Sequence, residues 1–407
     1  MPPSPLPPDE NPLPRDETTA TSSLGEVRST ASAAPRLSRE EEAKLALEGT
    51  AISPSVARSL CLLFLLTIFC VPVLQTAVNA RRGQAIVPAL SGDRQLIPVA
   101  AQLKQFETRL ERDSVAAQWV LPRVQSALTR GGVGNEQAYI GRHGALVYRP
   151  DVDYLTGAGF LNASTLKSRV QTKTSESAPV QPDPAKAIVG FRDQLAQRGI
   201  GLILVPTPSK PMLHPDQLAA RYGESAGALQ NPSYQQFLEQ MAEHQIVVCD
   251  PTAPLESARR RTGKAQFLDT DTHWTPDAMQ IAATALAASV RDNVELPAQP
   301  QFRPSRRAVL CSNRGDIAAM LKIPAREGLF PPQQVTTEQV LTEGGEVWKP
   351  SPSADVLLLG DSFTNIYSTA GMGWGSGAGL AEQLSFELRR PVDVIAVNAG
   401  GASTSRR

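Results

Sequence analysis

The segment Asp355-Val-Leu-Leu-Leu-Gly-Asp-Ser-Phe363 indicates how this chain folds. Its first part is a short apolar run without helical periodicity, and Gly360-Asp361-Ser362 ends that run as a tight turn does. Such a run is typical of a buried strand in a parallel sheet. Ligands collect at the carboxyl ends of these strands, so we expect Ser362 to face a substrate, with its own backbone N–H directed at an oxyanion.

The residues after this turn complete a predicted β-α-β unit. They comprise a glycine-rich stretch, a helical segment and a second apolar run, at 371–379, 380–390 and 392–397. The second strand would bring Asn398, Gly400 and Gly401 beside the end of the first strand. We expect backbone N–H groups of the two glycines to complete an oxyanion hole, although an ordinary strand-to-helix turn explains the same glycines equally well.

A serine hydroxyl attacks a carbonyl well only when an imidazole takes its proton and a carboxylate holds that imidazole in the correct tautomer. The four histidines of the chain are His143, His214, His244 and His273. Only His273 has a carboxylate two residues before it and an aromatic residue directly behind it. In an extended or loop segment Asp271 and His273 project to the same side, so the carboxylate can reach the imidazole nitrogen that faces away from Ser362.

Two features of the motif Asp271-Thr-His-Trp274 have an alternative interpretation. Taken alone, Asp-x-His is also typical of a solvated loop with an N-cap before the helix suggested by residues 275–278. Trp274 could offer an aromatic face to a sugar ring, but a residue in this position also commonly packs to fix the loop.

The two motifs, in this order and at this spacing, resemble the SGNH-hydrolase-like domain of the alginate O-acetyltransferase proteins of the AlgJ and AlgX type. Three further segments resemble the same domain, at 139–148, 205–210 and 314–321. The resemblance covers 139–407 and implies an α/β fold, the SGNH-hydrolase-like (flavodoxin-like) three-layer architecture with a parallel central sheet. It also implies that Ser362 is transiently acetylated, that His273 is the general base and that Asp271 orients it, with Asn398 to Gly401 as the oxyanion block.

The chain departs from the family pattern at its C-terminus. The third SGNH block, which supplies an asparagine or its substitute on a further strand, is not present here. Related domains usually continue through at least one more strand and helix, whereas this sequence stops at Arg407. The alternatives are a truncated product, a sheet completed by a neighbouring element, or an incomplete and weak site.

Composition along the chain predicts one catalytic domain with appendages. Residues 1–57 are rich in Pro, Ser, Thr and Glu without aromatics, which predicts a disordered tail. The uncharged residues 59–78 are long enough to cross a bilayer, so we assign a transmembrane anchor to 58–80. A helical stem follows at 81–135, with a break or kink at Pro122, and the SGNH-hydrolase-like domain occupies 136–407.

The charges beside the span do not fix its orientation. The nearby basic residues are Lys44 and Arg58 before it and Arg81, Arg82 and Arg94 after it. The resemblance implies a short cytoplasmic tail, a single-pass anchor and a periplasmic or otherwise extracytoplasmic catalytic domain. Residues 78–80 could be a signal-peptidase site, but a leader that begins so far from the N-terminus is atypical, so we favour an uncleaved anchor.

These inferences together predict a membrane-anchored O-acetyltransferase that acts on hydroxyls of an exported or cell-envelope polysaccharide through an acetyl-serine intermediate. The resemblance further implies a membrane-bound O-acyltransferase as its partner. The 40 basic and 40 acidic residues, without zinc-type cysteine spacing, a Walker loop or a dinucleotide fingerprint, give no indication of nucleic acid, metal or cofactor. A carbohydrate acetylesterase and a non-catalytic polysaccharide-binding or assembly subunit are the alternatives.

Overall fold

The computed structural model describes residues 53–83, 104, 107–108, 112–171, 181–223, 227–299 and 302–400. The chain divides into two compact units, Met1–Thr76 and Ala77–Arg407. The predicted tail lies outside the described residues except for its last five positions, and Gly401 lies outside them as well. The predicted domain boundaries stay predictions.

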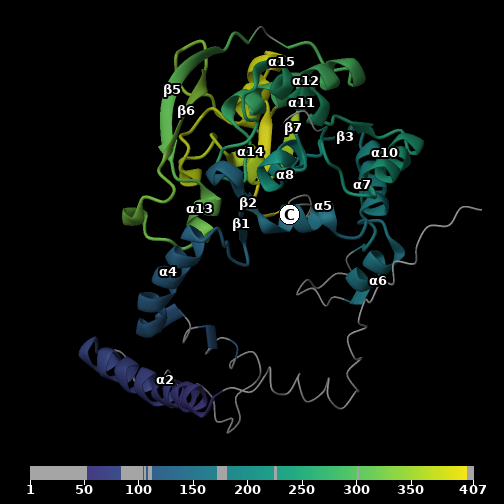
Figure 1. The fold of residues 1–407 in the computed structure, drawn as a ribbon. Coiled ribbons are helices and arrows are strands. Elements are labelled where there is room, and N and C mark those ends of the chain that lie inside the picture. Colours follow the sequence, from purple (N-terminus) through teal and green to yellow (C-terminus); the bar gives the residue numbers. More distant parts are fainter. Residues whose placement is uncertain are drawn as a thin grey trace, which may run out of the picture. The chain divides into compact units, whose positions relative to one another are not determined.

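A long apolar helix, α2 (Pro54–Arg81), contains the predicted anchor (Figure 1). None of its side chains is buried, and its most apolar window has a mean hydropathy of 2.3. Within the described part of the chain it is the one helix long and apolar enough to cross a membrane. The N-terminal region therefore holds a helix that can serve as an anchor.

The second unit contains the remaining helices and strands, which Figure 1 colours by their position in the sequence. Its helices are α4 (Val115–Arg130), α5 (Arg149–Thr156), α6 (Ala163–Gln171), α7 (Pro184–Ala196), α8 (Lys210–Leu213), α9 (Pro215–Leu218), α10 (Tyr234–Glu243), α11 (Thr252–Thr262), α12 (Pro276–Asn293), α13 (Asp316–Met320), α14 (Ser362–Asn365) and α15 (Leu380–Leu388), with 3-10 turns at Arg142–Gly144, Ala325–Glu327 and Ala370–Met372. Its strands are β1 (Ala138–Ile140), β2 (Leu146–Tyr148), β3 (Ile203–Leu204), β4 (Val247–Val248), β5 (Ser305–Asn313), β6 (Gln333–Leu341), β7 (Leu357–Gly360) and β8 (Asp393–Ala396).

The described strands form four two-stranded sheets. The pairs β1/β2 and β5/β6 are antiparallel, whereas β3/β4 and β7/β8 are parallel. Side chains connect the two parallel pairs, because Ile203, Leu358 and Val394 pack against the same apolar cluster. A continuous parallel central sheet is thus not formed by hydrogen bonds among the described strands, and the three-layer arrangement stays a prediction.

The β-α-β unit at the C-terminal end of the domain is confirmed. Strand β7 pairs in parallel with β8 from Leu357↔Asp393 to Gly360↔Ala396, and α15 lies between them in sequence. The prediction that the first strand is buried is wrong, because Leu357 and Leu359 are 50% and 36% exposed. Side chains alternate across a strand, so Leu358 packs on the core while its two neighbours point away from it.

Helix α4 is continuous through Pro122, so the predicted break at this residue is absent. Proline removes one backbone donor, but the helix continues for two further turns beyond it. The hydroxyl of Ser114 caps the first turn by accepting the N–H of Ala117 at 3.2 Å. Between Val115 and Arg130 the stem is therefore one unbroken helix.

The largest apolar cluster lies beneath both predicted motifs. It includes Trp274 from the histidine motif, Tyr367 and Trp374 from the segment after the serine, and Met279 from α12. The helix predicted after the histidine motif is confirmed, with the hydroxyl of Thr275 accepting the N–H of Ala278 at 3.3 Å. This shared core fixes the two motif segments relative to each other.

Candidate active site

Asp271 and His273 contact each other on the loop before α12. An isolated antiparallel bridge between Phe267 and Trp274 closes this loop. Oδ1 of Asp271 lies 2.6 Å from Nδ1 of His273 and also accepts the backbone N–H of His273 at 3.1 Å. Both side chains are buried. A carboxylate at Nδ1 holds the proton on that nitrogen, which leaves the lone pair of Nε2 available to act as a base.

The second oxygen of the Asp271 carboxylate is also fully engaged. Oδ2 accepts the indole N–H of Trp374 at 2.9 Å and the backbone N–H of Asp316 at 3.0 Å. Burial disfavours the charged carboxylate, but hydrogen bonds from His273 and Trp374 together with the charge of His273 outweigh burial and lower the pKa of Asp271 to about 2. The acid is therefore held in its ionised form.

Asp316 supports the loop through Thr272. The backbone N–H of Thr272 donates to Oδ1 of Asp316 at 2.8 Å, and its hydroxyl donates to Oδ2 at 2.6 Å. The hydroxyl oxygen of Thr272 also lies 3.1 Å from Nδ1 of His273. Burial and the negative charge of Asp271 raise the pKa of Asp316.

The side chains of Asp271, His273 and Asp316 form a cluster of a size that could hold a metal ion, with donor atoms within 4.8 Å of one another. However, each carboxylate oxygen and Nδ1 of the imidazole already takes part in a hydrogen bond. The arrangement is thus a hydrogen-bonded network that orients the imidazole, which fits a general base better than a metal ligand.

Ser362 is the first residue of α14, directly after the turn that ends β7. The side chain of Asp361 caps this turn by accepting the N–H of Phe363 at 2.9 Å. The ring of Phe363 lies with its centroid 4.9 Å from that of His273, so the serine turn packs against the histidine loop.

No hydrogen bond joins Ser362 to His273 in the described part of the chain, and the buried Nε2 of His273 has no partner there. Catalytic hydrogen bonds often tighten only when substrate is bound. The structure therefore brings together the acid and the base, and it places the serine segment against the ring of the base.

The end of β8 lies beside the serine turn, as the β-α-β unit predicted. The N–H of Val397 donates to the carbonyl of Gly360 at 3.1 Å, and the amide nitrogen of Asn365 donates to Oδ1 of Asn398 at 2.7 Å. The N–H of Gly400 instead donates to the carbonyl of Val397 at 2.8 Å and closes a turn. Gly400 is therefore not placed as an oxyanion donor, which corrects the expectation, and Gly401 lies outside the described residues.

Trp274 is a core residue and not a surface on which a sugar could stack. Its side chain is fully buried, its ring packs edge-on against Phe363 with centroids 5.2 Å apart, and its carbonyl accepts the hydroxyl of Tyr367 at 2.7 Å. The expectation of a substrate contact by this side chain is therefore wrong. The alternative, in which the indole packs to fix the histidine loop, describes the structure.

Several residues of the site had no role assigned from the sequence. Besides Asp316, a buried lysine, Lys210, donates from Nζ to the carbonyls of Leu146 at 2.7 Å and Asp269 at 3.2 Å. This ties strand β2 to the loop that carries Asp271. Burial lowers the pKa of Lys210 to about 8, an effect that neighbouring carboxylates oppose.

Asp151 is a further acidic group near the site. It lies in the first turn of α5, close enough for the charges of Lys210, Asp316 and His273 to influence its titration. Burial raises the pKa of Asp151 to about 7, against the lowering effect of Lys210. The segments at 139–148 and 314–321 were the available signal for Asp151 and Asp316, because they flank or contain these residues.

The other histidines are unsuited to the role of base. Nε2 of His214 accepts the N–H of Gln266 at 3.0 Å. Burial, with the positive charges of Arg259 and Lys210, lowers the pKa of His214 to about 3, so its imidazole stays neutral and engaged. His143 and His244 are exposed.

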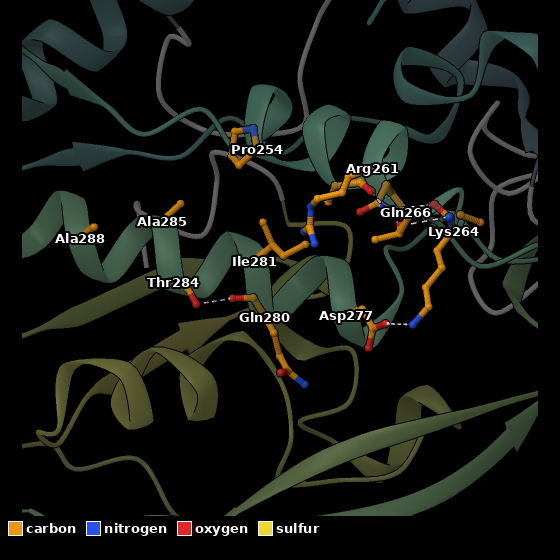
Figure 2. Close-up of a pocket in the computed structure, with 13 residues that line it drawn as sticks. Pro254, Arg261, Lys264, Gln266, Asp277, Gln280, Ile281, Thr284, Ala285 and Ala288 are labelled. Atoms are coloured by element: carbon orange, nitrogen blue, oxygen red, sulfur yellow. Dashed lines mark hydrogen bonds and ion pairs between the residues drawn. The ribbon is translucent and has the colours of Figure 1, made fainter. Parts of the chain in front are cut away.

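The pocket in Figure 2 is separate from these groups. It has a volume of about 580 Å³ and lies between α11 and α12, where Arg261, Ile281 and Ala285 point into it. At its mouth Nζ of Lys264 pairs with the Asp277 carboxylate at 3.1 Å. None of its lining residues is a predicted site residue, so the pocket does not mark the reacting centre.

Comparisons with known proteins agree with the family that the two motifs resemble. A family model described as "SGNH hydrolase-like domain, acetyltransferase AlgX" matches residues 166–406. The probable alginate O-acetylase AlgJ of Pseudomonas fluorescens is 32% identical over 183 residues, which cover 44% of this chain and 45% of that protein. The protein of the same description from Pseudomonas aeruginosa is 28% identical over 229 residues, covering 53% and 56%.

Among solved structures, the O-acetyltransferase domain of Pseudomonas putida AlgJ aligns with 66% of this chain and 83% of that domain, at 22% identity and a TM-score of 0.48. Pseudomonas aeruginosa AlgX aligns with 65% of this chain and 54% of that protein, at 16% identity and a TM-score of 0.42. The chain spans about half the length of the curated relatives that it matches.

Proposed function

Because the chain belongs to the AlgX family of SGNH hydrolase-like acetyltransferase domains, we propose that it transfers acetyl groups to polysaccharide hydroxyls through an acetyl-serine intermediate. The observation that supports this most is the 2.6 Å contact between Asp271 and Nδ1 of His273, together with the buried, unpartnered Nε2 on the other side of the ring. The imidazole is thereby prepared to accept a proton. Curated relatives are named as probable alginate O-acetylases, which agrees with this chemistry.

In the first half-reaction Ser362 is the nucleophile. Its Oγ attacks the acetyl carbonyl of a donor while Nε2 of His273 takes the hydroxyl proton. The leaving group departs from the tetrahedral intermediate and receives that proton from the imidazolium, which Asp271 stabilises. The backbone N–H of Ser362, which has no acceptor within the described residues, supports the developing oxyanion.

In the second half-reaction the acceptor replaces the leaving group. A sugar hydroxyl gives its proton to Nε2 of His273 as its oxygen attacks the acetyl-serine carbonyl, and the proton then returns to Oγ of Ser362. Water in place of the sugar would give hydrolysis and acetate. Transfer therefore depends on how well the loaded site holds the sugar and excludes water.

The relatives' names place alginate first among the acceptors to test. We also propose that α2 anchors the chain in a membrane, with the catalytic domain on the periplasmic or extracytoplasmic side. In this arrangement a membrane-bound O-acyltransferase is the partner that brings acetyl groups to the site.

The proposal is tested by supplying p-nitrophenyl acetate and alginate oligosaccharides to the detergent-solubilised chain, wild type beside Ser362→Ala. We expect acetylated oligosaccharide that depends on Ser362. Serine-dependent acetate without acetylated sugar would identify an acetylesterase instead. Equal background signals in both proteins, with both folded, would favour a non-catalytic polysaccharide-binding or assembly subunit.

A further inference from the structure

Helix α4 has the reverse of the usual arrangement of polar and apolar faces. Its buried residues are Ser126 and Thr129, which are polar. Its exposed large side chains, here called the apolar stripe, are Trp119, Val120, Leu121, Val124 and Leu128. A helix packed on a protein core normally buries such a stripe and exposes its polar residues. The apolar stripe of α4 is therefore available for another apolar environment.

The helix is attached to the catalytic domain through its other face and its C-terminal end. Arg130 pairs with Glu327 at 2.7 Å, and the amide nitrogen of Asn135 donates to the carbonyl of Met320 at 3.0 Å. The amide nitrogen of Gln125, in α4, donates to the carbonyl of Gly134 in the turn that follows the helix, at 3.3 Å. The contacts of Arg130 and Asn135 hold the C-terminal end of α4 on the domain, and the apolar stripe is exposed.

The charge of α4 is positive only. Its sequence contains Arg123 and Arg130 and no acidic residue. The Arg123 guanidinium lies 4.1 Å from the centre of the Trp119 ring and donates to the carbonyl of Trp119. Val120, Leu121, Val124 and Leu128 share one face of the helix, and Arg123 and Trp119 follow beside that face. A tryptophan and an arginine at the flank of an apolar face suit the boundary between lipid headgroups and acyl chains, and the positive charge suits anionic lipids.

We propose that α4 lies in the surface of the lipid bilayer that α2 spans, with the apolar stripe inserted among the headgroups. The inference rests on the anchoring role proposed for α2, which ends at Arg81, ahead of the start of α4 at Val115. An anchored chain keeps α4 at a high effective concentration near the bilayer, so even a short interfacial helix binds there. A second attachment of this kind restricts how the domain rotates about its anchor.

The tryptophans of the chain allow a direct test. Of the four, Trp274, Trp348 and Trp374 are at most 5% exposed, whereas Trp119 is 61% exposed. The full chain is reconstituted at low density into phosphatidylcholine and phosphatidylglycerol vesicles, with or without bromine on the acyl chains. We expect brominated lipid to quench part of the tryptophan emission, and Trp119→Phe to remove that quenched part.

Two further variants separate insertion of α4 from simple exposure of a tryptophan. In the Trp119→Phe background, Ile200→Trp adds an indole at a half-exposed site after α7, and we expect brominated lipid not to quench it. Leu121→Glu with Val124→Glu puts two charges into the apolar stripe and should abolish quenching of Trp119, while near-ultraviolet circular dichroism shows the domain core intact.

Vesicle flotation distinguishes failure of this inference from failure of the anchor. A chain that floats with the vesicles but whose Trp119 is not quenched would overturn the interfacial helix and leave the anchor in place. A chain that stays in solution would overturn both. An emission shift of Trp119 that depends on protein density and is insensitive to bromine would show that a second copy covers the apolar stripe, which also contradicts the inference.

Discussion

The orientation of the base, His273, depends on the carboxylate of Asp271. Its two oxygens accept hydrogen bonds from both N–H groups of His273, from Trp374 and from Asp316. An asparagine in this place carries no negative charge. It therefore does not hold the proton on Nδ1 of His273 as the carboxylate does. We expect Asp271→Asn to lower kcat for acetyl transfer by about 10⁴-fold, as the loss of the correct tautomer does in related triads.

A steady-state assay with p-nitrophenyl acetate measures this loss. A thermal melt close to that of the wild type would show that the fold survives. Full activity of Asp271→Asn would show that another acid orients the imidazole.

Trp374 acts on the same carboxylate from the opposite side. Trp374→Phe keeps an aromatic ring in the core but removes the indole N–H that donates to Oδ2 at 2.9 Å. Because that bond favours the ionised form, its loss should raise the pKa of Asp271 and move the acid limb of the pH–rate profile to higher pH. We expect a drop in kcat of about 10-fold near neutral pH, the size of one hydrogen bond to a charged group.

Trp348→Phe is the matched control, since Trp348 is a buried tryptophan in a different cluster. It should change stability without moving the acid limb. An equal displacement of the acid limb in both variants would mean that the effect comes from core packing.

Asp151 gives the stability of the fold a distinct pH dependence. Burial, opposed by Lys210, raises its folded-state pKa to about 7 from the usual 3.8. Between these values the folded chain holds a proton that the unfolded chain has lost, so stability falls as pH rises through this window. Asp151→Asn removes the titrating group and should therefore stabilise the protein at pH 8 by roughly 1–3 kcal/mol relative to wild type, and little at pH 4.

Thermal unfolding of both proteins across pH 4–8 measures this difference. The wild-type melting temperature should fall more steeply than that of Asp151→Asn. Parallel curves would show that Asp151 titrates in its usual range.

At the scale of single residues, the sequence predicted contacts between residues that are close together in the chain. Asp271 and His273 are two residues apart, so their contact follows from the backbone of a short loop. The partners of Asp271 at Trp374 and Asp316 lie 103 and 45 positions further along the chain, and only the packed core brings them close. The burial of Trp274 depends on the same core, so its sequence neighbourhood left packing and substrate contact open as alternatives.

At the scale of elements, a glycine lets the N-terminus of α13 approach the histidine loop. Gly315 has a φ of +85°, and a Cβ there would lie 2.3 Å from the carbonyl oxygen of Thr270 and 3.0 Å from the backbone nitrogen of Asp271. Gly315→Ala must therefore displace the loop. We expect it to lower the free energy of unfolding by about 1–3 kcal/mol. It should also reduce acetyl transfer, because the backbone N–H of Asp316 then no longer donates a hydrogen bond to the carboxylate of Asp271.

Gly328→Ala is the matched control for backbone strain alone. Gly328 has a φ of +65° with nothing within 4 Å of the added Cβ. Circular dichroism melts and the transfer assay are run on both variants. If the two variants lost the same activity, close approach at Gly315 would not be what positions the loop.

The elements that the sequence predicted well are those with a strong local pattern. The apolar runs at 355–359 and 392–397 gave β7 and β8 and their parallel pairing. Which face of β7 and β8 is exposed, and how the strands divide into pairs, depends on the elements that lie beside them. Neither property can be inferred from one apolar run in the sequence. The unbroken helix across Pro122 likewise depends on the Ser114 cap and on packing beyond the proline.

At the scale of the whole molecule, two short motifs and their order predicted the family, which the family model confirms over residues 166–406. The anchor was predicted from the length of an uncharged apolar segment, and the structure has a helix long and apolar enough to cross a membrane at Pro54–Arg81. Cys249 and Cys311 are buried free thiols, a state that the sequence alone does not determine. Their separation in space is a tertiary property that spacing in the sequence does not contain.

The central claim is that Ser362 carries the acetyl group between donor and acceptor. The most direct measurement is mass spectrometry of the chain quenched in acid after brief exposure to p-nitrophenyl acetate, followed by peptide mapping. We predict one added acetyl group on the peptide that contains Ser362, absent in Ser362→Ala and reduced in His273→Ala. A folded wild-type protein without acetyl on this peptide, or with equal labelling in Ser362→Ala, would contradict the account.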